Sequence, residues 1–156
     1  MCLGSCLEFR IRRATLEDLD SLVEIEAKCF ADEAFTRNQL DYCLKSSDFV
    51  CLVALVDKKM VGFVIGSVEI FSGEMAGHVY TLDVLEGYRK RGFGSRLLDA
   101  FESILAERGI RAVYLEVRVD NIPARRLYSK HGYKPFKVLK DYYEPKADAV
   151  MLRKIL

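Results

Sequence analysis

The sequence HVYTLDVLEGYRKRGFGSRLL, residues 78–98, carries the most specific pattern in the chain. An apolar, strand-like run leads directly into basic residues, a Gly-x-Gly turn and the start of an amphipathic helix. The first amides of a helix lack intrahelical partners, and the helix dipole places partial positive charge there. Glycines at 92 and 94 remove the Cβ atoms that would keep a ligand's oxygens away from those amides. The segment therefore predicts an anion site suited to a pyrophosphate, formed by Arg89, Lys90, Arg91, Gly92, Phe93, Gly94 and Ser95.

The same pattern is compatible with a plain strand–turn–helix in which the glycines serve only the turn and the basic residues are solvated. Two common nucleotide sites fit less well. The dinucleotide fingerprint G-x-G-x-x-G requires a third glycine, where this chain has Leu97. The GxxxxGK[ST] phosphate loop is absent from the sequence. A phosphate-bearing ligand outside these two classes is the remaining prediction.

The apolar periodicity on both sides of this segment predicts an α/β domain. In chain order the expected elements are a strand at 7–13 with Leu7, Phe9 and Ile11 inward, helices starting after Thr15 and Thr36, strands at 49–56 and 60–70, a loop at 72–77, a strand at 78–85, a helix ending at Gly109, a strand at 111–118, a helix at 122–131, and strands at 133–140 and 147–154. Thr15 with Asp18 and Thr36 with Gln39 have the spacing of capping boxes. The order β α α β β β α β α β β implies a mixed, mostly antiparallel sheet flanked by helices.

Composition indicates one globular domain covering residues 1–156, with residues 1–6 loosely ordered. Hydrophobic residues make up 51% of the chain, and 24 Lys and Arg are balanced by 23 Asp and Glu. The net charge of +1 argues against a nucleic-acid partner, and no apolar run approaches the ~18 residues of a membrane span. The N-terminal sequence MCLGSCLEFRIRRA lacks the basic start and apolar run of a secretory signal, so we expect a cytoplasmic protein.

The cysteines do not predict a disulfide framework or a metal site. There are 5 of them, an odd number, and they are scattered through apolar segments. Cys2 and Cys6 form a C-x3-C pair without a second Cys/His pair downstream. Reduced thiols are the simpler interpretation, with a Cys2–Cys6 disulfide as the alternative.

A second block, LEVRVDNIPARRLYSKHGY at residues 115–133, supplies a further motif. Together with Arg89-x-x-Gly92-x-Gly94 it resembles the signatures of the GNAT superfamily of N-acetyltransferases. The second block is similar to that of the RimI-like protein N-terminal acetyltransferases and their archaeal relatives. The resemblance is residue-specific over 78–133 and follows the element order from residue 7 to the C-terminus. Glu86, where the family often has proline, departs from the pattern but lies outside the glycine turn.

This resemblance implies a single GNAT-like domain that uses acetyl-CoA as cosubstrate and no metal. The strand backbone at Leu82, Asp83 and Val84 would hold the cosubstrate, with further contacts from Asn121 and Tyr128. Asn121 is also a natural helix N-cap, and both roles are compatible.

Acetyl transfer to an amine needs a neutral amine, a proton acceptor, and a proton for the departing thiolate. An α-amino group has a pKa near 7.7–8.0, so about a tenth of it is neutral at pH 7 and a carboxylate is a sufficient base. Glu116 lies between Leu115 and Val117, and by strand alternation it points away from both. The resemblance makes Glu116 the proton acceptor and Tyr128 the general acid. A solvated charge and a core tyrosine are the alternatives.

The two histidines, His78 and His131, belong to no triad or metal pattern. A catalytic role for His78 is the lesser alternative for that residue. His131 lies near the end of an expected helix, where it would interact favourably with the helix dipole.

By the same resemblance, the acceptor peptide would lie between the segment 30–35 and the segment 141–146. The candidate acceptor-binding residues are Phe30, Glu33, Tyr142 and Tyr143. The two tyrosines would pack the first side chain of the peptide. Glu33 would attract the α-ammonium or a basic residue, or be solvated. Ala31 and Asp32 replace the Pro-Trp of many RimI-like sequences, which predicts a broad acceptor range.

The expected function is therefore acetylation of protein N-termini. One alternative is a small amine, such as a polyamine or an amino sugar, facing Asp32, Glu33 and Glu144. The other alternative is a CoA-binding module without catalysis. The sequence leaves open proximity to the ribosome, or an auxiliary subunit docked on the first two helices.

Overall fold

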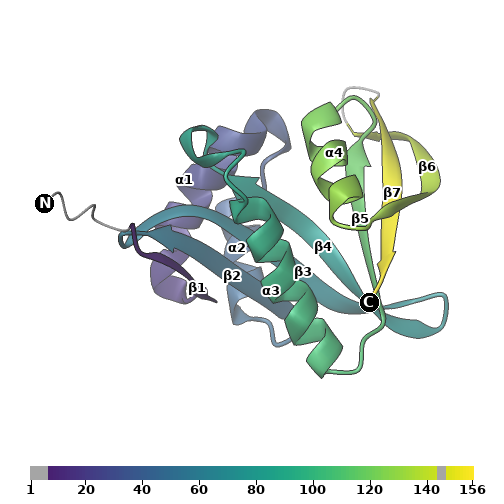
Figure 1. Cartoon of the computed structure of the whole chain (residues 1–156), viewed down its shortest axis with the longest axis horizontal. Helices are drawn as coiled ribbons and strands as arrows, with labels where there is room; N and C mark the ends of the chain where they lie inside the picture. Colours follow the sequence, from purple (N-terminus) through teal and green to yellow (C-terminus); the bar gives the residue numbers. More distant parts are fainter. Residues whose placement is uncertain (1–6, 144–146) are drawn as a thin grey trace, which may run out of the picture.

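The computed structural model describes residues 7–143 and 147–156, which form an α/β domain around a seven-stranded sheet (Figure 1). The strands are β1 (Phe9–Arg13), β2 (Phe49–Val56), β3 (Lys59–Phe71), β4 (Glu74–Val84), β5 (Ala112–Arg118), β6 (Lys134–Tyr143) and β7 (Ala147–Ile155). The helices are α1 (Leu19–Phe30), α2 (Arg37–Lys45), α3 (Phe93–Glu107) and α4 (Ile122–Lys130). The predicted order of elements is confirmed. Cys2, Cys6, the segment 1–6 and Glu144 lie outside the described residues.

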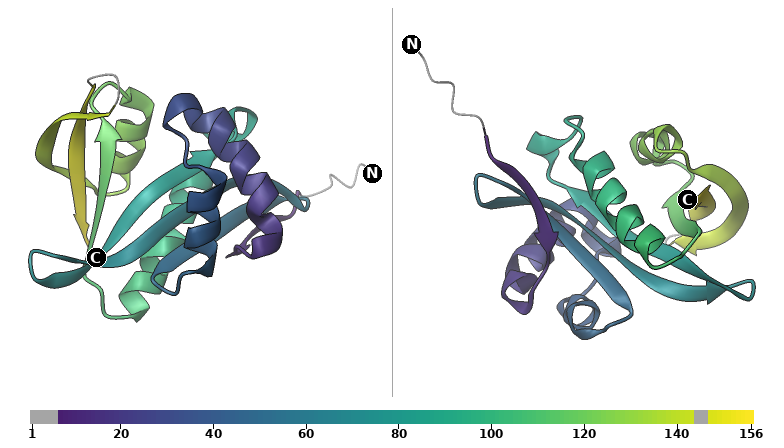
Figure 2. Two further views of the ribbon diagram at one scale, coloured as in Figure 1. Left: turned by 180° about the vertical axis from the view of Figure 1, so that it is seen from behind. Right: turned by 60° about the horizontal axis from the view of Figure 1, so that its bottom comes forward.

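The sheet is mixed and mostly antiparallel, as expected. Its strand order is β1-β2-β3-β4-β5-β7-β6, and β4–β5 is the parallel pair within it. α1 and α2 cover one face and α3 covers the other, with α4 beside β5 and β7 (Figure 2). We call these the α1/α2 face and the α3 face. Among the described residues, no helix is both long and apolar enough to cross a membrane.

Each face of the sheet has its own core. On the α1/α2 face, Leu22 and Leu40 pack against Phe63 of β3. On the α3 face, Leu97 and Phe101 pack against the sheet. Gly66 of β3 allows this close approach, because a Cβ atom at that position would lie 2.3 Å from the Phe101 ring.

Both predicted capping boxes form. Thr36 Oγ1 accepts from the Gln39 amide at 3.2 Å, and Gln39 Oε1 accepts from the Thr36 amide at 2.8 Å, so α2 starts where expected. Asp18 accepts from the Thr15 amide at 2.7 Å. This capping box precedes a single 3₁₀ turn, Leu16–Asp18, and α1 begins after that turn. Arg12 also pairs with Asp18, at 2.8 Å.

Three strand boundaries were predicted incorrectly. The first strand begins at Phe9 because pairing starts there, opposite Val56, and Leu7 is 62% exposed rather than inward. The expected loop at 72–77 is a two-residue turn: Ser72 and Gly73 both have positive φ, so pairing resumes at Glu74. The strand expected at 133–140 continues to Tyr143 through an irregularity in its register with β7. Tyr142 and Tyr143 are therefore strand residues rather than loop residues.

Two buried carboxyl groups, Glu26 on α1 and Asp83 on β4, meet at the hydroxyl of Thr81; each residue is 1% exposed. Thr81 Oγ1 lies 2.5 Å from Asp83 Oδ1 and 3.2 Å from Glu26 Oε2, and the Phe35 amide donates to Glu26 Oε1. One hydroxyl proton serves only one of two acceptors, so a carboxyl proton must supply the other bond. Burial, together with the hydrogen bond and charge of Glu26, raises the pKa of Asp83 well above its usual range. Asp83 is therefore the protonated partner.

This assignment predicts that Asp83→Asn stabilises the protein at neutral pH. Asp83 is neutral in the folded state but ionises in the unfolded chain, so its contribution to stability falls as pH rises above the ordinary carboxyl range. The amide of the variant keeps the shape and the donated hydrogen bond without this loss. We expect melting temperatures that match near pH 3.5 and favour the variant by several degrees at pH 7, since about 1 kcal/mol shifts Tm by ~2–4 °C in such a domain.

The control is Asp48→Asn, at an exposed position. It should show no gain that grows with pH. A loss of stability in Asp83→Asn at both pH values would mean that Asp83 is ionised and required as an anion.

Candidate active site

The candidate functional residues gather where β4 and β5 separate. Their parallel pairs join residues 77–79 to residues 113–115, and beyond these β4 and β5 diverge (Figure 1). Tyr80 is bulged, because Val79 pairs with Gly66 of β3 and Thr81 with Ile65. A bulge bends its strand and increases the local twist. The result is a break in the hydrogen-bond ladder, where groups from both faces of the sheet can approach one another.

The glycine turn lies on the α3 face at the end of β4. Gly92 is the N-cap residue of α3 with φ +85°, and no side chain caps the helix. Gly94 is buried beside α4, where a Cβ atom would lie 3.2 Å from Leu127. Leu82 and Val84 also point toward Gly94, whereas the side chain of Asp83 points to the α1/α2 face. The turn therefore presents backbone amides rather than side chains at the start of the helix.

The basic residues of the turn lie in different environments. Arg89 Nε donates to the Val84 carbonyl at 2.8 Å, and its Nη2 lies 3.8 Å from Cys29 Sγ. Lys90 and Arg91 are exposed, and the Arg91 guanidinium lies over the Tyr88 ring. Arg89 thus ties the turn to the end of β4, which leaves Lys90 and Arg91 as the freer cations.

On the α1/α2 face, Glu116 belongs to a hydrogen-bonded chain of side chains. Its Oε2 lies 2.6 Å from His78 Nε2, and His78 Nδ1 lies 3.1 Å from Glu69 Oε2. Glu69 Oε1 accepts from Ser67 Oγ at 2.8 Å and from the hydroxyl of Tyr80. The Glu116 side chain is 12% exposed and that of His78 is 19% exposed. The imidazole therefore fixes the orientation of the Glu116 carboxylate.

The two carboxylates set the charge of His78. Burial lowers the pKa of His78, but the hydrogen bond and charge of Glu116, together with Glu69, outweigh it and raise the pKa above its usual value. The pKa of Glu69 is lowered overall. Burial alone would raise it, but hydrogen bonds from Tyr80, Ser67 and His78 outweigh burial. The arrangement favours an imidazolium that donates to a carboxylate on each side.

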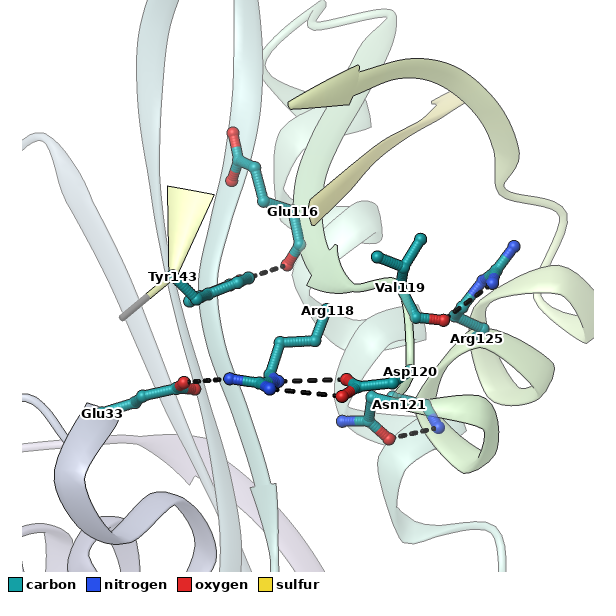
Figure 3. A network of polar contacts seen from close by, with 9 residues as sticks. Glu33, Glu116, Arg118, Val119, Asp120, Asn121, Arg125 and Tyr143 are labelled. Carbon is teal, nitrogen blue, oxygen red and sulfur yellow. Dashed lines mark hydrogen bonds and ion pairs between the residues drawn. The ribbon is translucent and has the colours of Figure 1, made fainter. Parts of the chain in front are cut away.

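Arg118 links three elements beside Glu116 (Figure 3). Its guanidinium pairs with Glu33 at 2.6 Å and with Asp120 at 3.0 Å. Glu33 belongs to the 3₁₀ turn Ala31–Glu33, so the ion pair joins the α1–α2 connection to β5. The Arg118 guanidinium carbon lies 5.9 Å from the centre of the Tyr143 ring, and the Tyr143 hydroxyl donates a hydrogen bond to the Glu116 carbonyl at 3.4 Å.

Tyr128 lies on the α3 face, in the core with Leu115 and Val117, and is 8% exposed. Burial raises the pKa of its phenol. The phenol therefore retains its proton at neutral pH. Asn121 caps α4, since its Oδ1 accepts from the Ala124 amide at 3.2 Å.

The structure brings some predicted site residues together and separates others. Glu33, Tyr143 and Glu116 are joined through Arg118, and Tyr142 packs its ring against Tyr143 at 4.9 Å. Phe30 ends α1, three residues before Glu33. Tyr128 and the glycine turn lie on the opposite face from Glu116.

The prediction overlooked part of the network around Glu116. His78 was the lesser alternative, and Ser67, Glu69, Tyr80 and Arg118 were not considered. A signal was present in the sequence, because Ser67 and Glu69 are alternate polar residues in a strand whose preceding stretch is apolar.

A family model for the acetyltransferase (GNAT) family matches residues 16–133. The chain belongs to the GNAT acetyltransferase family. An N-alpha-acetyltransferase of Sulfurisphaera tokodaii is 35% identical and aligns over 93% of this chain and 92% of its own length. The crystal structure of Ard1 from Thermoplasma volcanium has a TM-score of 0.85 at 30% identity, covering 95% and 97% of the two chains. The ribosomal-protein-S18-alanine N-acetyltransferase of Escherichia coli shares the fold, with a TM-score of 0.85 at 22% identity over 95% and 94%.

Like other GNAT enzymes, the protein is an acetyl-CoA-dependent N-acetyltransferase. The glycine turn fits the pyrophosphate of this cosubstrate, because among the described residues no side chain caps the α3 N-terminus, and Gly92 and Gly94 carry no Cβ atoms that would shield its amides. Among the described residues, no group of three or more His, Cys, Asp or Glu could hold a metal ion.

The network predicts that Glu69→Gln lowers the pKa of His78. Loss of the Glu69 charge removes one of the two interactions that favour the imidazolium. In the parent protein the His78 pKa should lie above 6.5, its ordinary value. The stability that this shift supplies is complete below pH 6.5 and is lost as pH rises through the His78 pKa of the folded state. An NMR titration of the imidazole Cε1–H measures both pKa values.

Glu74→Gln, at an exposed position at the start of β4, is the control and should leave the His78 titration unchanged. If the His78 pKa in Glu69→Gln equals that of the parent protein, the charge of Glu69 does not contribute to the raised pKa of His78.

Proposed function

We propose that the protein acetylates the α-amino group of protein and peptide N-termini by direct attack, with Glu116 as proton acceptor and Tyr128 as proton donor. The observation that supports this most is the Glu116 carboxylate, held by His78 beside the break between β4 and β5. Relatives named N-alpha-acetyltransferase that cover nearly all of the chain support the same substrate class.

Glu116 suits the proton-accepting role by its hydrogen bonding. His78 occupies Oε2, while Oε1 takes no hydrogen bond from the described residues and is free to accept from an amine. The contact with His78 at 2.6 Å also fixes the position of the carboxylate. Since about a tenth of an α-amine is already neutral at pH 7, a carboxylate base suffices, either directly or through one water.

Tyr128 suits the proton-donating role by its position and protonation. Its burial keeps the phenol protonated, and it lies on the same face as the glycine turn. Transfer to a thiolate of pKa near 8.5 is uphill for such a phenol, so it requires close approach of the sulfur. Acetyl-CoA supplies the acetyl group when bound, with its pyrophosphate held at residues 89–95 and contacts from Asn121 and the backbone of 82–84.

The acceptor would enter on the α1/α2 face, past the α1–α2 connection and the end of β6. Phe30, Tyr142 and Tyr143 provide aromatic surface along this path. Glu33 is paired with Arg118, so its role there is to hold the connection against β5 rather than to attract a free cation.

This proposal predicts that Glu116→Gln and Tyr128→Phe lower kcat much more than they weaken CoA binding. Each variant keeps the shape of the side chain but removes the group that accepts or holds a proton. We expect kcat to fall about a hundredfold in Glu116→Gln and about tenfold or more in Tyr128→Phe, within the range of general acid–base contributions. Thiol release from acetyl-CoA with a free-N-terminus peptide measures kcat, and calorimetry measures CoA affinity.

Tyr114→Phe, which removes a hydroxyl from β5 but keeps Glu116 and Tyr128, is the control and should retain parental kcat. Unchanged turnover in both test variants would contradict the assigned roles. Matching peptides with a blocked N-terminus and an internal lysine, and spermidine, complete the acceptor set; turnover on spermidine alone would instead identify a small-amine enzyme.

A further inference from the structure

A cavity of about 320 Å³ opens between α2 and strands β2–β4, on the same face as Glu116. Its lining includes Phe35, Tyr42, Cys43, Phe49, Ile65 and Tyr80. Four of these are aromatic, and their rings are in sequential contact: Tyr42 with Phe49 at 6.0 Å, Phe49 with Tyr80 at 5.5 Å, and Tyr80 with Phe35 at 6.3 Å. This volume falls at the small end of the range for ligand sites.

Tyr80 connects this cavity with the network around Glu116. Its ring forms a wall of the cavity and lies 4.3 Å from the ring of His78, while its hydroxyl donates to Glu69. His78 in turn holds Glu116. Tyr80 therefore connects the wall of the cavity to the residue that holds the Glu116 carboxylate.

Phe35 connects the cavity with the acceptor path. It lies within the α1–α2 connection, two residues after Glu33, and its amide donates to Glu26 Oε1 at 3.3 Å. Two lining residues therefore border the proposed site: Tyr80 contacts His78, and Phe35 belongs to the segment along which the acceptor would enter.

We propose that this cavity receives the side chain of the acceptor's first residue, so that the enzyme favours N-termini beginning with Met or Leu over those beginning with Ala or Ser. The inference rests on the proposed function and gives a narrower acceptor class than the broad range predicted from Ala31 and Asp32. The lining combines aromatic rings with the aliphatic side chains of Leu40 and Ile65, so it favours an apolar side chain that leaves water on entering the cavity. The lining contains no carboxylate that could pair with a cation. Tyr142 and Tyr143 then contact the peptide beyond its first side chain.

The test uses peptides that are identical after the first residue, which is Met, Leu, Ala, Ser or Lys. We expect kcat/KM for the Met and Leu peptides to exceed that for the Ala and Ser peptides by about tenfold or more, the scale of discrimination by an apolar pocket. The Lys peptide tests whether the cavity binds a cation instead, because aromatic rings can also bind cations.

Cys43→Phe places a ring in the cavity and should reduce the Met-to-Ala ratio of kcat/KM toward one. Cys43→Met fills less volume and is the second variant in case the first fails to fold, and it should reduce the ratio in part. Lys45→Met, on the same helix but outside the lining, should leave the ratio as in the parent. Retention of CoA affinity confirms that each variant is folded.

Equal rates on Met and Ala peptides, a preference for the Lys peptide, or a ratio that survives in both Cys43 variants would each overturn this inference while leaving N-terminal acetylation in place. A ratio that also falls in Lys45→Met would overturn the assignment to the cavity. Turnover on none of the free-N-terminus peptides, with spermidine still acetylated, would overturn the proposed function itself.

Discussion

The short parallel pairing of β4 with β5 is the constraint on which the rest of the site depends. The two strands pair over residues 77–79 and 113–115 and then separate beyond the bulge at Tyr80. If they continued to pair, their backbone groups would satisfy one another and the faces of the sheet would be sealed from each other. Because they diverge, the glycine turn and Tyr128 on one side and the Glu116 network on the other surround the same break.

The elements were predictable where a local rule decides them. The box of Thr36 and Gln39 marks the start of α2, and the helix that begins after the glycine turn ends before Gly109, which has a φ of +78°. The boundaries that failed depend on pairing between strands. A Ser-Gly turn is indistinguishable in sequence from part of a longer loop, and the extension of β6 to Tyr143 requires a register with β7 that no local pattern contains.

The site was predictable only in part, for a similar reason. The glycine turn, Glu116 and Tyr128 lie in contiguous motifs that resemble a known family. The partners of Glu116 do not: His78 is 38 residues away in sequence, and Glu69 is 9 residues from His78. Their meeting depends on the register between β3 and β4 and on the brief contact of β4 with β5. Arg118 and Glu33 are 85 residues apart, and alternation on β5 does not identify that partner.

The break in the ladder also determines how two ligands share the protein. The glycine turn and the Glu116 network lie on opposite faces of the sheet. In the proposed reaction, the cosubstrate and the acceptor would therefore approach the break from different sides. A single compound that joined the two would have to pass between β4 and β5, so its linking portion could be no wider than the space between two diverging strands. Away from the break between β4 and β5, the paired strands of the sheet would keep the two ligands apart.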